Sequence, residues 1–512
     1  MACRRLVRAL VLLVLVTPLA ADSIAVDWAM VAKIREEGLQ RSRVMEFESY
    51  MTDVLGARLT VSQDMTRARA WAVAALTRLG LQRVAAEPFM DYGVAWDNEY
   101  VSLHMLEPDY APMTGYPLAH TPGTAGRQVA RAVIVDLQVK ADLDTYRGKI
   151  AGAIALVSPP VAIDVAALAA GVPRRTDDEL RKLEQTVIAP ARAAPRVPRN
   201  PDLLTPAEKM AFLKSEGVTA VFQCDSGWIG AVRGFARPGT KDDQWSRAAS
   251  LASPVIVAVT PEHYNRMYRI VKRAVPVSVE IEVRSRIGDR VEQAMNILGE
   301  IPGGDLAGEV VMMGAHFDTW HASPNASDNT SGVAVVLEAA RILKAVGAKP
   351  RRTIRVALWG GEEQGLYGSR AYVLKTFGDP NDPKVGAKPA YETFAAYFNQ
   401  DYGAGQYRGI YLQGNEHARQ MLTAWLEPFR DLGMTVVSNQ SVGSTDHVPF
   451  DNAGLPGFQF LQDRIPGTGG HTNLDYLDTI QPDDLMKNAV IMASYVYHAA
   501  MSDARVPRKI RR

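Results

Sequence analysis

A histidine and a carboxylate two positions apart have types and a spacing that suit a metal site. His316 and Asp318 follow an apolar run with strand character, Val310 to Met313. Alternate residues of a strand point to the same face, so both side chains can act at one site. A polar loop then leads to Asp328 at the start of an apolar helix. An imidazole with carboxylates at a strand's end is a reasonable beginning for a zinc site, but a reaction requires further ligands and a base.

Two adjacent carboxylates, Glu362 and Glu363, follow the strand-like run Thr353 to Trp359. Neighbouring side chains diverge at a strand-to-helix turn. One carboxylate can therefore bind a metal while the other acts as a general base. A solvated, acidic helix N-terminus explains the same pair without catalysis and is the simpler interpretation when the pair is taken alone.

Two further candidates lie toward the C-terminus. Asp401 follows the strand-like run Thr393 to Asn399, and His471 lies in a Gly-rich loop before the last helix. Taken singly, such residues are more often a turn aspartate and an exposed loop histidine. Taken together, the candidates form a mixed nitrogen and oxygen set suited to zinc: His316, Asp328, Glu362, Glu363, Asp401 and His471.

Strands and helices alternate from about Ile281 to the end of the chain, which predicts an α/β fold with a sheet covered on both faces. Ligands of such sheets gather at strand ends. The expected helices are Ser331 to Val346, Glu363 to Leu374, Glu416 to Leu432 and Pro482 to Met501, and a further strand is expected at Gly457 to Leu461.

The N-terminal part predicts two helices between Ala25 and Leu81, then strands at Arg83 to Phe89 and Glu99 to Leu106. The pattern changes at about Pro108 to a compact, strand-rich unit. Within that unit, a segment near residues 165–201 is rich in Ala, Arg and Pro, and we expect it to be a mobile excursion.

The composition is that of a globular protein without a dominant charge. A chain of 512 residues is long enough for two or more domains, since single cores stop growing near roughly 250 to 300 residues. Lys and Arg number 57 against 56 for Asp and Glu, which argues against a nucleic-acid binder.

Residues 1–21 have the pattern of a secretory signal peptide. Three arginines precede the apolar run Ala9 to Leu15, and small residues follow before Asp22. The run is shorter than the about 20 residues that span a bilayer, so a retained anchor is the less favoured alternative. We predict a secreted or periplasmic protein without membrane contact after cleavage. Its one remaining thiol, Cys224, is expected to be buried and structural.

Five motifs resemble, in order, those of the dinuclear zinc exopeptidases, a family that includes secreted bacterial aminopeptidases and carboxypeptidase Q: GAHFDTW, SDNTSG, WGGEEQGLYGS, NQD and GGHTNLDYLDT. The resemblance implies the zinc-exopeptidase fold, with a central mixed, largely parallel sheet flanked by helices. The stretches DLDTYRGKIAGAIALVS and KSEGVTAVF resemble the protease-associated domain found in many members. The expected organisation is a signal peptide (1–21), a discontinuous zinc peptidase domain (22–108 and 276–504), a protease-associated-like insert (109–275) and a basic tail (505–512).

The same resemblance implies two zinc ions per chain. His316, Asp328 and Asp401 would bind one ion, and Asp328, Glu363 and His471 the other, with Asp328 as the bridge. Glu362 would be the general base, and Asp318 would orient the ligating histidine. One departure from the family pattern lies in the loop HASPNASDN, where His321 and Pro324 replace a Gly-rich stretch and can change the wall of the pocket.

The function that follows is hydrolysis of peptide bonds at chain ends, by an exported aminopeptidase or by a dipeptidase or carboxypeptidase. The substrate would be a peptide or dipeptide, and a homodimer is the assembly to test. Two alternatives stay open: a single-zinc acyltransferase resembling glutaminyl cyclase, and an inactive binding protein on the same fold.

Several residues near these motifs are not assigned to catalysis. Ser444, Asp446 and His447 in GSTDHVPF do not form a triad, because neighbours in sequence cannot easily orient one another and no G-x-S-x-G motif accompanies them. The family has a similar stretch that shapes the substrate pocket, so we expect a pocket-lining role. His321 is expected to be an exposed loop residue.

Overall fold

The structure is a computed structural model that describes residues 24–163, 174–187, 200–239, 243–463 and 470–509. The predicted signal peptide lies outside the described residues. Within the described ranges, no helix combines the length and the apolar character that crossing a membrane requires. Cys224 is buried, as expected.

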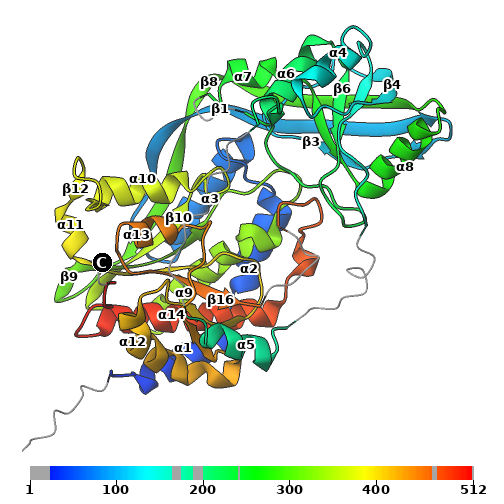
Figure 1. The fold of residues 1–512 in the computed structure, drawn as a ribbon. Coiled ribbons are helices and arrows are strands. Elements are labelled where there is room, and N and C mark those ends of the chain that lie inside the picture. The colour runs from blue at the N-terminus through cyan, green and yellow to red at the C-terminus, as the bar shows by residue number, and fades with distance from the viewer. Residues whose placement is uncertain (1–23, 164–173, 188–199, 240–242, 464–469, 510–512) are drawn as a thin grey trace, which may run out of the picture.

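The C-terminal half forms a mixed sheet, which confirms the predicted α/β fold (Figure 1). Its strands run in the order β15-β14-β16-β13-β9-β10-β8, and the pairs β10–β9, β9–β13, β13–β16 and β14–β15 are parallel. The bounds are β8 Ser278–Ile301, β9 Leu306–His316, β10 Arg352–Trp359, β13 Phe394–Asn399, β14 Tyr407–Tyr411, β15 Val436–Ser438 and β16 Gly457–Gln462.

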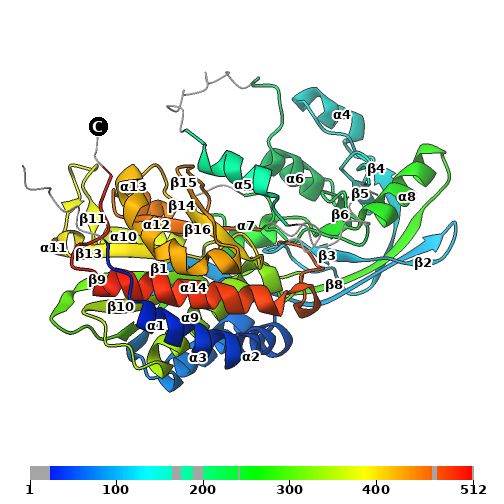
Figure 2. The same cartoon turned by 90° about the horizontal axis from the view of Figure 1, so that it is seen from below.

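The central strands are continuous apolar runs because helices cover both faces of the sheet. In β9, Val311 and Met313 enter one core, whereas Met312 between them enters the other. The first core lies under α9 and α14, and the second lies under α10 and α13 on the opposite face (Figures 1 and 2). The helices of this half are α9 Ser331–Ala345, α10 Tyr367–Thr376, α11 Pro389–Glu392, α12 Arg419–Leu426, α13 Val448–Asn452 and α14 Pro482–Met501.

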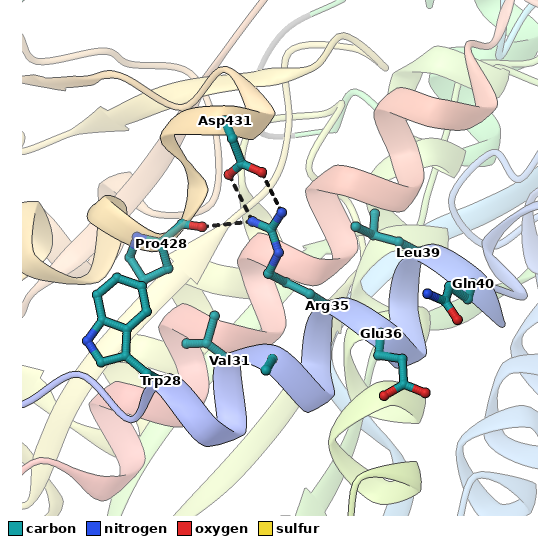
Figure 3. A pocket seen from close by; sticks show the side chains of 9 residues that line it. Trp28, Val31, Arg35, Glu36, Leu39, Gln40, Pro428 and Asp431 are labelled. Atoms are coloured by element: carbon teal, nitrogen blue, oxygen red, sulfur yellow. Dashed lines mark hydrogen bonds and ion pairs between the residues drawn. The ribbon is translucent and has the colours of Figure 1, made fainter.

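The N-terminal helices complete the first layer, where α1 packs on α14 and α2 packs on α9. These helices are α1 Trp28–Gln40, α2 Val44–Ser49 and α3 Gln63–Arg78. A surface groove runs beside α1 and the segment Pro428 to Asp431 (Figure 3). Arg35 crosses it, donating to the Pro428 carbonyl oxygen at 2.8 Å and to the Asp431 carboxylate at 2.9 Å.

A long antiparallel ribbon carries the chain out of this domain and back. It consists of β1 (Gln82–Glu107) and β8, paired from Gln82 opposite Glu300 to Glu107 opposite Ser278. The two strands that we expected between residues 83 and 106 are thus one irregular strand. The far end of the ribbon supplies Leu103 and Ile281 to the core of the insert, so the two domains share one sheet.

The insert is an α/β unit on that ribbon, at the upper right of Figure 1. Strands β4, β5, β6 and β7 are parallel neighbours, and β3 pairs antiparallel with β7. The bounds are β2 Ala111–Pro112, β3 Gly115–Pro117, β4 Gln128–Ile134, α4 Leu143–Tyr146, β5 Ile154–Leu156, α6 Pro206–Ser215, β6 Ala220–Gln223, α7 Arg247–Ala252, β7 Ile256–Val259 and α8 Pro261–Lys272.

The described part of the expected excursion forms a helix, α5 (Asp177–Glu184), which packs on β15 of the C-terminal half (Figure 2). Thr176 caps its N-terminus in a capping box with Glu179. Leu180 enters a small core with Leu461, and Ser438 Oγ donates to the Leu183 carbonyl oxygen at 2.6 Å. This segment of the insert is therefore fastened to the other domain.

Candidate metal centre

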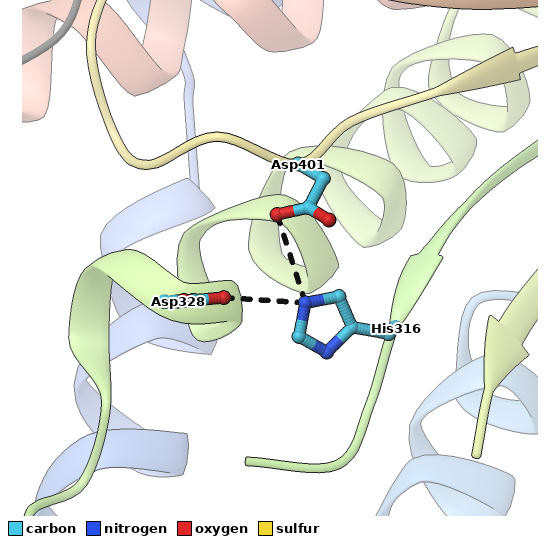
Figure 4. Close-up of side chains that lie close together, drawn as sticks. All are labelled: His316, Asp328 and Asp401. Carbon is cyan, nitrogen blue, oxygen red and sulfur yellow. Dashed lines mark ion pairs between the residues drawn. The ribbon is translucent and has the colours of Figure 1, made fainter. Parts of the chain in front are cut away.

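Three of the predicted ligands meet at the carboxyl ends of two neighbouring parallel strands. His316 is the last residue of β9, and Asp401 follows β13. Asp328 reaches them from the loop before α9. The Nε2 atom of His316 lies 3.2 Å from Asp328 Oδ1 and 3.7 Å from Asp401 Oδ1 (Figure 4). Their ligand atoms are close enough to hold one metal ion.

A second group of three shares Asp328 with the first. His471 Nε2 lies 3.0 Å from Asp328 Oδ2 and 2.8 Å from Glu363 Oε2. The two carboxylate oxygens of Asp328 thus face different imidazoles, His316 through Oδ1 and His471 through Oδ2. This is the geometry expected of a carboxylate that bridges two ions.

The donor atoms and their surroundings fit zinc. Two imidazoles and three carboxylates match the nitrogen and oxygen ligands that zinc accepts. Glu363 Oε1 is buried and has no hydrogen-bond partner among the described residues, which leaves its lone pairs available for a cation. Gly470 leaves room beside Asp328, since a Cβ atom there would lie 2.4 Å from Asp328 Oδ2.

The charges of the site are strongly coupled. Burial raises the pKa of Glu363 to about 7, although His471 opposes that shift. Burial alone would lower the pKa of His471, but Glu363 and Asp328 outweigh it and raise that pKa to about 11. Carboxylates crowded in a buried site favour cations, whether these are protons on imidazole or a bound metal.

The register of the sheet explains why residues far apart in sequence meet here. Trp359 at the end of β10 pairs with His316, and Asn399 at the end of β13 pairs with Gly314. The loops after these strands therefore leave the sheet at one edge. The edge of parallel strands at their carboxyl ends is where α/β folds bind ligands.

Asp318 is buried beside His316, but its carboxylate points to the acidic turn. It accepts hydrogen bonds from the main-chain N–H groups of Glu362 at 3.0 Å and Glu363 at 3.2 Å. The nearest acceptor for His316 Nδ1 is the main-chain carbonyl oxygen of Asp318 at 2.9 Å, with the carboxylate at 4.0 Å. Asp318 thus links the histidine to the turn that carries both glutamates.

Glu362 and Glu363 lie in a turn and not on the helix that we expected to begin at residue 363, because α10 begins only at Tyr367. Gly365 and Leu366 have positive φ angles of 130° and 60°, which a helix does not accommodate. Glu362 is 9% exposed. Burial raises its pKa well above the ordinary value, and the carboxylates of Asp401 and Glu363 add to the shift while His316 opposes it.

Two buried residues near the centre were not assigned a catalytic or ligand role from the sequence. Arg58 donates from Nε to the Phe317 carbonyl oxygen at 2.8 Å and from Nη2 to Thr330 Oγ1 at 2.7 Å. It therefore links the residue after β9 to the residue before α9, the two ends of the loop that carries Asp328. Asp446 is fully buried, and burial raises its pKa to about 7, with Asp318 among the carboxylates that add to the shift. Asp446 lies in GSTDHVPF, for which we expected a pocket-lining role, and Arg58 lies in the stretch GARLTVSQ near the N-terminus.

The insert forms one wall of the centre. The ring of Phe235 meets the ring of His471 edge to face at 5.2 Å, and Trp320 packs against Phe235 at 5.6 Å. His321 is half-buried and not exposed as expected. Its Nε2 atom lies 2.7 Å from the Pro117 carbonyl oxygen, and it belongs to neither group of ligands.

Known proteins resemble this chain in sequence and in fold. Carboxypeptidase Q of Pongo abelii is 25% identical over 251 residues, 49% of this chain and 50% of the relative, so the match spans about half the length of that protein. The Peptidase M28 precursor from Shewanella amazonensis SB2B shares the fold at a TM-score of 0.67, with 22% identity over 94% of this chain and 99% of that one. BSAP, a zinc aminopeptidase from Bacillus subtilis, aligns at a TM-score of 0.57 with 18% identity, covering 90% and 96% of the two chains.

The family profile matches the part of the chain that holds all five candidate ligands. Residues 296–496 match peptidase family M28. This range begins in β8 and ends within α14, and it includes both groups of ligands. The part of the chain that builds the candidate metal centre therefore matches the model of peptidase family M28.

Proposed function

We propose that this protein is an exported exopeptidase that uses two zinc ions to hydrolyse peptide bonds at chain ends. The observation that carries the proposal is the position of Asp328, which faces one imidazole through each carboxylate oxygen. Glu362 lies beside this pair without belonging to either group of ligands. The resemblance to a zinc aminopeptidase in fold, and to carboxypeptidase Q in sequence, supports the same chemistry.

Glu362 is the general base in this proposal. Zinc, when bound, acidifies a water molecule and polarises the carbonyl group of the scissile bond. Glu362 accepts the proton that the attacking water loses and delivers it to the leaving nitrogen as the carbon–nitrogen bond breaks. A pKa raised by burial suits this role, because the carboxyl group must hold the proton between the two transfers.

The charge of the centre favours an aminopeptidase. Glu362 and Asp446 place further carboxylates beside the candidate ligands, and a free α-ammonium group is the part of a peptide that such a site attracts. Removal of residues from the amino end is therefore the expected direction. Export rests on residues 1–21, and N-terminal sequencing of secreted protein should give a start near Asp22.

Metal analysis and two matched variants test the proposal. We expect two zinc ions per chain and hydrolysis of peptides with a free amino end. Glu362→Gln should keep both ions and lose about 10²- to 10⁴-fold in kcat. Glu363→Gln, at the neighbouring position, should instead lose zinc.

The alternative outcomes are distinct. One zinc ion with cyclisation of N-terminal glutamine would identify a glutaminyl-cyclase-like acyltransferase. Two ions with peptide binding but no turnover would identify a binding protein. Cleavage in chain interiors would refute the exopeptidase assignment, and unchanged turnover of Glu362→Gln would remove that residue as the base.

A further inference from the structure

The candidate bridging carboxylate, Asp328, lies between two neighbours that are hydrogen-bonded in different directions. On one side, Ser327 donates to Asp475 twice, from its main-chain N–H to Oδ1 at 2.8 Å and from its Oγ to Oδ2 at 2.9 Å. On the other side, the side-chain amide of Asn329 donates to the Gln400 main-chain carbonyl oxygen at 2.8 Å. The loop that carries Asp328 is thus held from both sides.

These bonds lead to the segments of two different candidate ligands. Asp475 lies on the segment that carries His471, and its main-chain carbonyl oxygen accepts from Ala326 N at 3.2 Å. Gln400 directly precedes Asp401. His471 belongs only to the second group of candidate ligands and Asp401 only to the first. The two neighbours of the bridging residue therefore connect it to one group each.

The side chains of Asp475 and Asn329 are fully buried, and neither belongs to a group of candidate ligands. Hydrogen bonds to a carboxylate are strong, and more so where water does not compete. The space between the loop and the His471 segment is tight, since a Cβ atom at Gly470 would lie 2.4 Å from Asp328 Oδ2. Ligands of a functional site must be held within about 0.5 Å of their working positions, so both segments have to be fixed relative to the loop.

We propose that Asp475 and Asn329 are positioning residues that hold opposite sides of the Asp328 loop, Asp475 for the second group of ligands and Asn329 for the first. This inference rests on the proposed centre of two zinc ions. Residues that orient a ligand through hydrogen bonds strengthen metal binding. Loss of Asp475 should therefore weaken the ion of the second group, and loss of Asn329 should weaken the ion of the first.

The test measures zinc dissociation constants, by competition with a chelator, in two backgrounds that each keep one group of ligands. Asp401→Asn leaves the second group intact, and Glu363→Gln leaves the first. In the Asp401→Asn background, Asp475→Asn should raise the zinc dissociation constant about 10- to 100-fold, because an amide offers one acceptor oxygen to the two Ser327 donors. In the Glu363→Gln background, the same substitution should leave the dissociation constant nearly unchanged.

Asn329→Ala should give the opposite pattern, with the large increase in the Glu363→Gln background. The substitution also removes the acceptor of Gly332 N, which lies 3.1 Å from Asn329 Oδ1, but that loss is common to both backgrounds. The difference between the backgrounds therefore reports the bond to Gln400. The control, Asp478→Asn at an exposed position, should change neither dissociation constant.

Zinc binding requires no turnover, which separates this inference from the proposed function. The expected pattern in a protein that hydrolyses no peptide would support both positioning roles, while the proposed function would fail. Equal increases in the two backgrounds for Asp475→Asn and for Asn329→Ala would overturn the inference, and so would unchanged zinc affinity in both.

Hydrogen exchange in the zinc-free protein gives a second measurement that does not depend on metal affinity. The main-chain amide of Ser327 should exchange faster in Asp475→Asn than in the wild-type protein, because its acceptor is altered. The same amide should keep its wild-type rate in Asn329→Ala. An unchanged rate in Asp475→Asn would show that Asp475 does not hold the loop.

Discussion

The Nδ1 atom of His316 lies 2.9 Å from the main-chain carbonyl oxygen of Asp318 and 4.0 Å from its carboxylate. The main chain of Asp318 therefore occupies Nδ1 and leaves Nε2 of His316 facing Asp328 and Asp401, while the Asp318 carboxylate accepts from the N–H groups of Glu362 and Glu363. A single residue connects His316 of the first candidate metal group, Glu363 of the second and the proposed base, Glu362. Its side chain acts on the glutamates and its backbone on the histidine.

This division of roles predicts the effect of Asp318→Ala. The substitution keeps the carbonyl that holds His316 but frees the turn at Glu362, so turnover should fall about 10- to 100-fold. Zinc analysis should show that the His316 site keeps its ion better than the Glu363 site. Asp305→Ala, an exposed carboxylate just before β9, is the control. Loss of both ions together would contradict this division.

The contact between Gly470 and Asp328 predicts that the smallest substitution there disturbs the metal centre. In Gly470→Ala, the new Cβ would lie 2.4 Å from Asp328 Oδ2, so the bridging carboxylate or the His471 loop must move. Zinc affinity, measured by competition with a chelator, should fall for at least one ion. Gly443→Ala is the matched control, since nothing lies within 4 Å of a Cβ at that position. Unchanged affinity in Gly470→Ala would show that Asp328 can shift at no cost.

The candidate ligands could be picked out from the sequence because each follows a strand of a parallel sheet or lies in a loop at the same edge. His316 and Asp401 occupy strand ends that the apolar runs predict directly. The wall formed by Phe235 was not predictable, because its contact with His471 joins segments more than 200 residues apart and leaves no periodic signal. The middle of β1 was missed for a local reason, since Gly93 and nearby aspartates interrupt the strand pattern.

The buried Glu48 of α2 should make the stability of the folded protein depend on pH. It is fully buried, neither carboxylate oxygen has a hydrogen-bond partner among the described residues, and burial raises its pKa well above 4.5. Asp475 and Asp53 add to that shift, and Arg58 opposes it. The folded state therefore binds this proton more tightly than the unfolded state. Its contribution to stability is complete below pH 4.5 and is lost as the pH rises through the folded pKa.

Glu48→Gln should remove this dependence. Relative to the wild-type protein, its thermal unfolding midpoint should rise progressively from pH 5 to pH 9, by the equivalent of about 1.4 kcal/mol for each unit by which the pKa is raised. Glu46→Gln, on the same helix, is the control with the opposite sign, because a hydrogen bond from Arg43 lowers the pKa of exposed Glu46. A constant difference between Glu48→Gln and wild type at all pH values would show that Glu48 does not titrate in this range.

The ion pairs of Arg174 should hold α5 on the peptidase domain. Its guanidinium pairs with the buried carboxylates of Asp484 and Asp463, and the N–H of Arg175 donates to Asp463 Oδ1 at 3.0 Å. Arg408 also pairs with Asp463 at 3.3 Å, so Asp484 is the carboxylate that depends most on Arg174. Arg174→Ala would leave that buried charge uncompensated.

The free energy that holds α5 on the sheet should fall by about 1 to 3 kcal/mol in Arg174→Ala. This value lies between those for exposed and buried ion pairs, because the Arg174 side chain is 40% exposed and its partner is buried. The α5 helix should then detach before the domain unfolds, so limited proteolysis should cut residues 174–187 faster in Arg174→Ala than in wild type. Arg181→Ala is the control, because it pairs only with exposed Asp178 in the same helix. Equal cleavage rates in the two variants would mean that the apolar contact of Leu180 holds the helix without the ion pair.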